Sequence, residues 1–268
     1  MYIRRSPIWP DPRAKPPFGA AEIDWTHAQA WGLLGCWLFN ERGGAVIHNM
    51  VDGRSSATTV NAPVWSSSAV GPAMTWTAAS SQYAVGDASF PAVNTAPGGL
   101  IFRGRLANVA SNYHMGCGRA DGSGLDWEVQ VTPAGHHSLA LNGGEWAPGT
   151  TLLTAGPWFD LAYTFYSDAG DFHEAFLNGQ PDGGPSAGHV GWPAATGVFE
   201  IGRRPTNAFY WDGDIAHIYF FNRRLTRSDV LWLTAEPYAF LRPIVRRRWS
   251  VPPQPAYSSP FPSHRSVA

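Results

Sequence analysis

The sequence from Phe209 to Pro237, FYWDGDIAHIYFFNRRLTRSDVLWLTAEP, contains the patterns that say most about the architecture of this chain. An aromatic run is interrupted by Asp212-Gly213-Asp214, and an alternation of apolar and other residues follows, as in a β-strand. The acidic turn has two interpretations. It is either a metal or catalytic site, or only the last hairpin of a β-sheet.

The end of this sequence carries the one clear helix signal. Residues 225–236, LTRSDVLWLTAE, begin with a Thr226 that can cap a helix, and Asp229 three residues later completes a capping box. Pro237 ends the pattern. The predicted apolar side of this helix consists of Val230, Leu231 and Leu233.

Upstream, the chain consists of short apolar segments separated by turn signals. Examples are GLLGCWLFNE, AMTWTAASSQYAVG, GGLIFRGRLAN, LDWEVQVTPAG, WFDLAYTFYSDAG and FHEAFLNGQPDGG. The last two form an apparent hairpin, and Asn178-Gly179 is a strong tight-turn pair. Many short, evenly spaced strands without helical crossovers predict two stacked antiparallel sheets, an all-β jelly-roll sandwich.

The composition agrees with an all-β chain. Of the 268 residues, 44% are hydrophobic and 13% aromatic, whereas only 15% are charged; Gly (29) and Pro (23) are abundant. Abundant turn formers and aromatics with few helix formers favour β-structure. Cys36 and Cys117 form no metal-binding pattern, so buried thiols are expected. No apolar segment is long enough to span a membrane.

The two ends differ from the body in charge. Residues 1–15 carry a net charge of +3 and residues 242–268 carry +5, which leaves the body at −9. We therefore divide the chain into a Pro-rich basic arm (1–24), a jelly-roll domain (25–238) and a Pro/Arg-rich tail (239–268). Such ends are typical of segments that contact a partner. The predicted assembly residues are Arg4, Arg5, Trp9, Arg242, Arg246, Arg247, Arg248 and Trp249.

The order of motifs resembles the laminin G-like, concanavalin A-like jelly-roll family. The segments that carry the resemblance are GLLGCWLFNERGG, VDGRSSATT, MTWTAASSQYAVG, PWFDLAYTFY, HEAFLNGQPDG, FEIGRR and YWDGDIAHIYFFNRRLTRSDV. The opening PPFGAAEIDWTHAQAWGLLGCWLFNE and the closing LTAEPYAFLRPIVRR are similar to the ends of laminin G-like proteins of tailed bacteriophages. The resemblance implies a virion protein, and it leaves open whether that protein decorates the head or belongs to a head or tail fibre.

The resemblance also implies a candidate calcium site, because many relatives bind Ca²⁺ at one edge of the sandwich. Asp52, Asp212 and Asp214 are the candidate ligands. Ca²⁺ takes about 6–8 oxygen ligands, and Ala216 stands where relatives often carry an acid. We therefore favour a plain turn over calcium and expect no cofactor.

Four aromatic residues beside Gly/Pro turns are candidates for stacking on sugars: Trp146, Trp192, Tyr210 and Trp211. A hydrolase is the weakest alternative, since Asp126 and Glu128 supply two carboxylates on one strand face but a third acid is missing. His136-His137 point to opposite faces of a strand, which disfavours a joint metal site. We therefore predict no enzyme activity.

The leading hypothesis is a virion structural protein held by its arms to other virion proteins and to copies of itself. A carbohydrate-binding module for adsorption to host glycans is the alternative. The acidic body disfavours nucleic acid. The N-terminus lacks an apolar signal segment, so we expect synthesis in the host cytoplasm and a final location in the virion.

Overall fold

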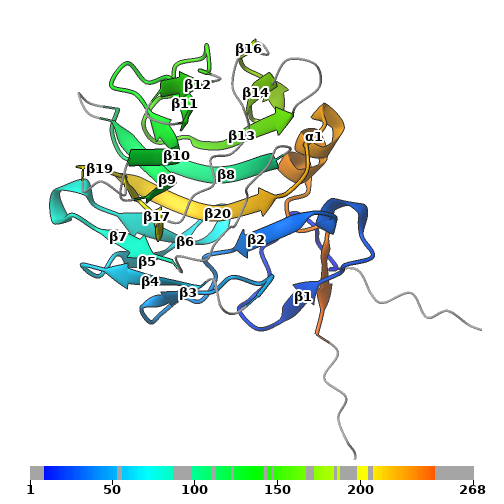
Figure 1. Cartoon of the computed structure of the whole chain (residues 1–268). Coiled ribbons are helices and arrows are strands. Elements are labelled where there is room, and N and C mark those ends of the chain that lie inside the picture. Colours follow the sequence, from blue (N-terminus) through cyan, green and yellow to red (C-terminus); the bar gives the residue numbers. More distant parts are fainter. Residues whose placement is uncertain are drawn as a thin grey trace, which may run out of the picture.

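Two antiparallel β-sheets stack face to face in the computed structural model of the chain (Figure 1). The structure describes residues 9–52, 56–86, 98–109, 113–121, 124–141, 144–146, 148–166, 172–183, 186–187, 198–204 and 208–244. The predicted all-β jelly-roll sandwich of the concanavalin A-like type is confirmed.

The first sheet has eight strands. In spatial order they are β12 (Gly144–Trp146), β11 (His137–Leu141), β10 (Gly124–Val131), β9 (His114–Asp121), β17 (Val198–Ile201), β7 (Tyr83–Val85), β4 (Ala57–Val60) and β3 (Val46–Ile47). A short hairpin of β18 (Arg203–Arg204) and β19 (Ala208–Tyr210) follows β17 and lies against β9.

The second sheet has nine strands. Its main order is β15 (Gln180–Pro181), β14 (Phe172–Leu177), β13 (Trp158–Tyr166), β8 (Gly98–Leu106), β20 (Gly213–Phe221), β6 (Gly71–Trp76) and β5 (Val64–Ser68), while β16 (Ser186–Ala187) pairs with β14 and β2 (Leu33–Trp37) with β20. The predicted hairpin is present as β13 and β14, and Asn178-Gly179 (φ 51° and 80°) turns β14 into β15.

Strand β20 explains why the sequence GDIAHIYFF is apolar on both sides, because all nine of its residues are buried. Ile218 and Phe220 point into the core between the sheets. Tyr219 and Phe221 point the other way, into a second core on the outer face of the nine-stranded sheet. This strand therefore serves two hydrophobic layers.

The second core is covered by segments from both ends of the chain (Figure 1). β1 (Ala21–Ile23) pairs with β21 (Leu241–Pro243), and the backbone N–H of Trp9 donates to the carbonyl of Leu241 at 3.0 Å. Helix α1 (Arg227–Ala235) contributes Val230 and Leu233. Residues 9–24 and 239–244 are thus packed on their own chain, because their apolar side chains complete this core, and their order needs no partner.

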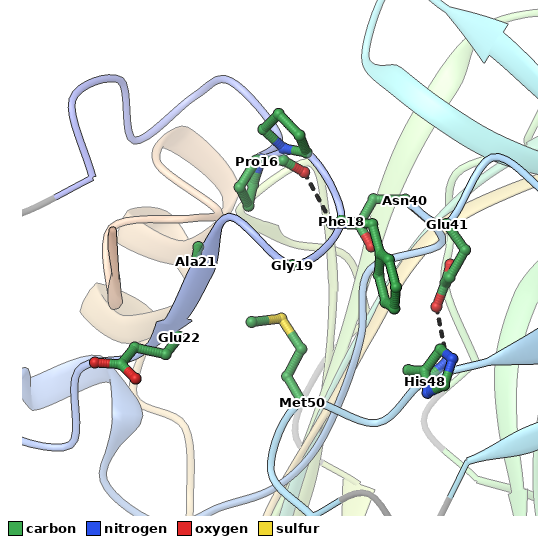
Figure 2. Close-up of a pocket in the computed structure, with 10 residues that line it drawn as sticks. Pro16, Phe18, Gly19, Ala21, Glu22, Asn40, Glu41, His48 and Met50 are labelled. Carbon is green, nitrogen blue, oxygen red and sulfur yellow. Dashed lines mark hydrogen bonds between the residues drawn. The ribbon is translucent and has the colours of Figure 1, made fainter. Parts of the chain in front are cut away.

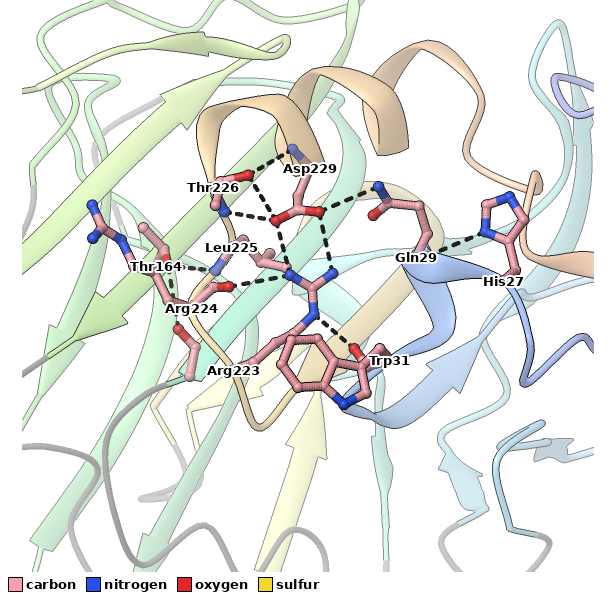
Figure 3. A network of polar contacts seen from close by, with 10 residues as sticks. His27, Gln29, Trp31, Thr164, Arg223, Arg224, Leu225, Thr226 and Asp229 are labelled. Carbon is pink, nitrogen blue, oxygen red and sulfur yellow. Dashed lines mark hydrogen bonds and ion pairs between the residues drawn. The ribbon is translucent and has the colours of Figure 1, made fainter.

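Arg223 joins the N-terminal segment to the start of α1 (Figure 3). Its guanidinium contacts Asp229 at 2.8 Å, and its Nε donates to the carbonyl of Trp31 at 2.7 Å. Gln29 donates to the same carboxylate at 3.2 Å. The predicted capping box of Thr226 and Asp229 is confirmed.

One detail of the predicted helix is wrong. Leu231 is 41% exposed, whereas Val230 and Leu233 are buried. The helix is short and rests on the sheet along a narrow stripe, so a residue next to the stripe faces outward. With nine residues α1 is far shorter than a bilayer requires, and no helix in the described ranges is long and apolar enough to cross one.

Candidate functional site

The strongest candidate site is a group of aromatic and arginine side chains on the outer side of the eight-stranded sheet. We call it the arginine–aromatic surface, and its residues are Tyr83, Tyr113, Arg203, Arg204, Phe209 and Tyr210. They come from β7, from the residue before β9, and from the β18–β19 hairpin. Apart from the buried Arg203, all of them are partly exposed.

Each arginine of this surface is held by a glutamate through two hydrogen bonds. Arg204 donates from Nε and Nη2 to Glu128 at 2.9 and 2.5 Å. Arg203 donates in the same way to Glu200 at 2.7 and 2.5 Å. Such bidentate pairs fix the plane of a guanidinium, because two parallel bonds leave it no freedom to rotate.

Glu128 depends on this pairing because it is fully buried. Its neighbours Trp127 and Val129 on β10 face the core between the sheets, so Glu128 points to the outer side, where Arg204 covers it. Burial raises the pKa of Glu128, whereas the hydrogen bonds and charge of Arg204 lower it.

The aromatic rings pack against these fixed guanidinium groups. Arg203 lies 3.5 Å from the ring centroid of Tyr83, and Arg204 lies 4.8 Å from that of Phe209 and 5.8 Å from that of Tyr113. Phe209 has a φ of 56°, in the left-handed region that non-glycine residues rarely occupy. Strained backbone of this kind is enriched at binding sites. The surface is therefore preorganised.

An open hollow of about 650 Å³ adjoins the surface, and Tyr113 belongs to both. Its other lining residues are Thr132, Pro133, Ala134, His136, Pro148, Gly149 and Thr150. Nδ1 of His136 lies 3.0 Å from the carbonyl oxygen of Gly149, which fixes the imidazole in the wall. The hollow combines apolar walls with a few polar groups, as small-molecule sites do.

The structure places the four predicted sugar-stacking aromatics in different environments. Tyr210 belongs to the arginine–aromatic surface, with its ring 6.4 Å from that of Tyr83. Trp211 is fully buried in the core beside Phe102, so the prediction that it stacks on a sugar is wrong. Trp192 and the side chain of Trp146 lie outside the described residues.

The three candidate calcium ligands do not converge on a metal site. Both oxygens of Asp214 are occupied, by Thr75 and by Arg105. Asp212 accepts hydrogen bonds from Asn108 and from the backbone of Ala78. Within the described ranges no three His, Cys, Asp or Glu side chains are grouped to hold a metal ion. Asp214 is paired with Arg105 instead, so calcium binding by Asp52, Asp212 and Asp214 stays a prediction without support from this geometry.

The glycine of the Asp-Gly step has a packing role. A Cβ on Gly213 would lie 2.0 Å from the carbonyl oxygen of Arg105, and its φ is 143°. The acidic turn in the sequence therefore marks the point where β20 enters between β8 and β6, and only glycine fits there.

The adjacent histidines separate as expected, with His136 in the hollow and His137 fully buried. Nδ1 of His137 lies 2.8 Å from the Tyr163 hydroxyl, and its Nε2 lies 2.8 Å from Asp182. Burial favours the neutral acid, but hydrogen bonds from Thr150, Thr151 and His137 lower the pKa of Asp182 to about 2. Burial also lowers the pKa of His137. This network joins the two sheets.

The outer face of the nine-stranded sheet holds a second group of ionisable residues, the covered polar cluster: Lys15, Arg103, Asp160 and His217. Arg103 contacts Asp160 at 2.9 Å, and the Lys15 amine donates to the carbonyl of Ala216 at 2.7 Å. Burial raises the pKa of Asp160 to about 6 and lowers that of Lys15 to about 7. The His217 ring stacks on Tyr219 at 4.5 Å. Asp160 and His217 are buried, with the His217 ring 5.9 Å from that of Tyr238, whereas Arg103 keeps 20% of its side chain exposed.

A smaller cavity of about 220 Å³ lies where the N-terminal segment meets the residues after β2 (Figure 2). The Phe18 ring lies 5.0 Å from that of His48, and Asn40 donates to the carbonyl of Pro16. Met50 points into it from below. It holds about seven waters by volume, which is smaller than most ligand sites.

Of the predicted assembly residues, the structure describes two. Arg242 pairs with Glu22 of β1 at 2.8 Å, and Trp9 donates from its indole to the carbonyl of Ala14. Both therefore contact their own chain. Arg4, Arg5, Arg246, Arg247, Arg248 and Trp249 lie outside the described residues.

Sequence reasoning missed most of the arginine–aromatic surface. Tyr83, Arg203 and Arg204 lie in segments that served only as fold motifs, SSQYAVG and FEIGRR. The sequence did contain one signal for this surface, the adjacent arginines Arg203 and Arg204 directly after an apolar strand. Two neighbouring arginines can each pair with a different acid. The partners Glu128 and Glu200 are 76 and 3 residues away, and only the fold reveals the first.

Fold and surface together define a concanavalin A-like sandwich domain with an open aromatic surface and a closed polar cluster. Residues 103–231 match the family model Laminin_G_3, described as the Concanavalin A-like lectin/glucanases superfamily. This confirms the resemblance to laminin G-like, concanavalin A-like domains. No curated protein sequence matches the chain.

Solved structures show the same fold at low sequence identity. Domain 4 of AbnA, an extracellular arabinanase from Geobacillus stearothermophilus in complex with arabinotriose, is 14% identical with a TM-score of 0.58; the match covers 80% of this chain and 99% of that one. Trypanosoma rangeli sialidase in complex with sialic acid is 14% identical (TM-score 0.56, covering 76% and 32%). The receptor binding domain of botulinum neurotoxin type G is 11% identical (0.53, covering 76% and 51%). This chain thus spans about a third of the sialidase and half of the toxin domain.

Proposed function

We propose that the chain is a carbohydrate-binding domain without enzyme activity, and that it binds saccharide at the arginine–aromatic surface and the adjoining hollow. One observation carries the proposal: partly exposed aromatic rings are fixed by two bidentate Arg–Glu pairs beside an open hollow. Sugars stack their C–H faces on aromatic rings and place their hydroxyls on nearby polar groups. Rings that are already fixed lose little conformational entropy on binding.

The polar residues of the hollow suit hydroxyl groups. Thr132, His136 and Thr150 line it among prolines, an alanine and a glycine. These side chains and the backbone carbonyl groups beside them can exchange hydrogen bonds with a saccharide, while the apolar wall receives its C–H groups.

The state of the carboxylates supports binding over hydrolysis. Glycoside hydrolysis needs two carboxyl groups about 5–10 Å apart, one to protonate the leaving group and one to act as base or nucleophile. Glu128 and Glu200 are each tied to an arginine through both oxygens. A carboxylate paired with an arginine in this way is held in its ionised form, which disfavours the role of a general acid. The side chain of Asp126, the other acid of the hydrolase alternative, lies outside the described residues.

The structural comparisons favour the same class of ligand. The arabinanase domain is in complex with a trisaccharide, and the sialidase with sialic acid. Because the identity is low, they support only the inference that this sandwich suits saccharide recognition, by analogy.

A titration of the purified chain with neutral oligosaccharides tests the proposal. We expect Tyr113→Ala to lower the affinity about fivefold, since one aromatic contact is worth about 1 kcal/mol. Trp31→Ala is the matched control, because Trp31 is 74% exposed but belongs to the segment beside α1. Equal losses in both variants, or no binding by the parent chain to any saccharide, would refute the site.

The virion role stays a prediction, and none of the comparisons bears on it. Its support is the sequence resemblance and the concentration of arginine in residues 242–268. Because residues 9–24 and 239–244 complete the second core, deletion of 1–8 and 245–268 is the informative truncation. If incorporation into particles is unchanged by both deletions, anchoring by these ends is excluded.

A further inference from the structure

We infer that the saccharide bound at the arginine–aromatic surface is uncharged. This inference rests on the proposed function and concerns the same site. Two arginines at a sugar-binding surface would ordinarily suggest an acidic sugar, because guanidinium groups recognise carboxylates through paired hydrogen bonds. The geometry of this surface points the other way.

The side-on edge of each guanidinium, formed by Nε and Nη2, is already occupied. Nε and Nη2 form the edge that accepts a carboxylate in parallel, and in Arg204 this edge faces Glu128. In Arg203 the same edge faces Glu200. Two arginines and two glutamates give these four side chains a net charge of zero, so they provide little long-range attraction for an anion.

A ligand carboxylate could take the Nε–Nη2 edge of Arg204 only by displacing Glu128, and at the Nη1 end it would meet a guanidinium whose charge Glu128 already balances. Glu128 is 0% exposed and its two oxygens accept both bonds from Arg204. Removal of one partner of a buried ion pair leaves a buried charge without compensation, and that cost exceeds what a partly exposed ligand pair returns. An acidic sugar is therefore expected to bind this surface more weakly than a neutral one.

A neutral sugar leaves both pairs intact. Phe209 and Tyr113 lie 5.3 Å apart by ring centroid, and the guanidinium of Arg204 is close to both rings. A sugar ring can stack on this pair and direct hydroxyl groups to the threonines of the hollow. The Arg–Glu pairs then act as supports for the rings and do not contact a ligand charge.

The test measures binding of matched neutral and acidic saccharides to the full chain at pH 7 and low salt. Lactose is paired with sialyllactose, and trigalactose with trigalacturonic acid. We expect the neutral member of a pair to bind at least about tenfold more tightly. Tighter binding of the acidic member overturns this inference alone, whereas no binding of any saccharide overturns the proposed function and this inference with it.

A charge-removing variant sharpens the result. Glu128→Gln removes the negative charge that balances Arg204, so we expect the ratio of acidic to neutral affinity to rise by about tenfold. Glu174→Gln is the control, because Glu174 contacts Arg224 at 3.6 Å on the other sheet. If Glu128→Gln does not fold, the matched neutral and acidic saccharides on the parent chain decide the question. An unchanged ratio of acidic to neutral affinity in the folded variant contradicts the inference.

Discussion

The outer faces of the two sheets carry similar chemistry in opposite settings. Each face has an arginine paired with a buried acid: Arg204 with Glu128 on the eight-stranded sheet, and Arg103 with Asp160 on the nine-stranded sheet. The first pair lies beside partly exposed aromatic rings and an open hollow. The second lies beside the second core that α1 and the terminal segments complete, although its arginine is as exposed as that of the first pair, at 20%. An ion pair alone therefore does not identify a site, because access decides its role.

The difference follows from what covers each sheet. On the covered face the terminal segments contribute Ile23, Tyr238 and Leu241 to a second core. The free energy gained by burying this apolar surface offsets the cost of burying polar groups whose hydrogen bonds are incomplete. Among them are Oδ1 of Asp160 and both ring nitrogens of His217, which have no hydrogen-bond partner among the described residues. Among the described residues, the terminal segments 9–24 and 239–244 pack on the nine-stranded sheet and leave the arginine–aromatic surface partly exposed.

The covered face should respond most strongly to the loss of an acid. Asp160→Ala leaves Arg103, which is 20% exposed, without its partner at 2.9 Å. We expect the free energy of unfolding to fall by about 3–5 kcal/mol at pH 8, where Asp160 is ionised in the parent. Urea unfolding measures this. Glu174→Ala at the surface pair with Arg224 is the control and should cost below about 1 kcal/mol. Equal costs would show that the cover does not matter.

On the open face the penalty should depend on pH. Arg204→Ala leaves Glu128 buried without a cation, so we expect a loss of about 2–3 kcal/mol at pH 8. The folded-state pKa of Glu128 is raised by burial, and without Arg204 it rises further. The unfolded state is the same in both chains, so the loss is smallest below the raised folded-state pKa of Glu128 in the parent and grows as the pH rises through it. Urea unfolding at pH 4 and pH 8 checks the sign, and a larger loss at pH 4 would contradict it.

Most of the architecture could be predicted because it depends on local patterns. Strand alternation, the Asn178-Gly179 turn and the Thr226 capping box are each written in adjacent residues, and all three are present. The pairing of β1 with β21 could not be predicted, since it joins segments some 220 residues apart. From the sequence alone, Pro-rich basic ends have the pattern of partner-binding arms. Their role in the second core becomes visible only in the folded chain.

The candidate site was harder to predict than the fold. Trp211 is next to Tyr210 in the sequence, yet one ring is in the core and the other is on the surface. A strand points neighbouring side chains to opposite faces, and the sequence does not say which face is covered. The glutamate that fixes Arg204 comes from β10, a strand far from the hairpin in the sequence, so its role depends on sheet order.

Helix α1, which packs on the second core, can be destabilised through its N-terminal cap. Thr226→Ala removes the side-chain cap of α1, which accepts from the backbone N–H of Asp229 at 3.2 Å. We expect a loss of about 1 kcal/mol in the free energy of unfolding. Faster hydrogen exchange should appear in α1 and its neighbours and not in β10 or β17. Exchange that accelerates equally on both sheets would show that the two faces unfold as one unit.

A matched pair of Tyr→Phe substitutions gives the smallest effect and the most direct comparison. The buried hydroxyl of Tyr219 on the covered face donates to the carbonyl of Pro237 at 3.0 Å, so Tyr219→Phe leaves that carbonyl without its donor and should cost about 1 kcal/mol. Tyr113 on the open face is partly exposed, and Tyr113→Phe should stay within about 0.5 kcal/mol. Because each variant removes only one oxygen atom, the difference in thermal or urea midpoint reports access to water alone. Indistinguishable midpoints would mean that the terminal segments leave the covered face open to water in solution, and that the contrast between the two faces does not hold.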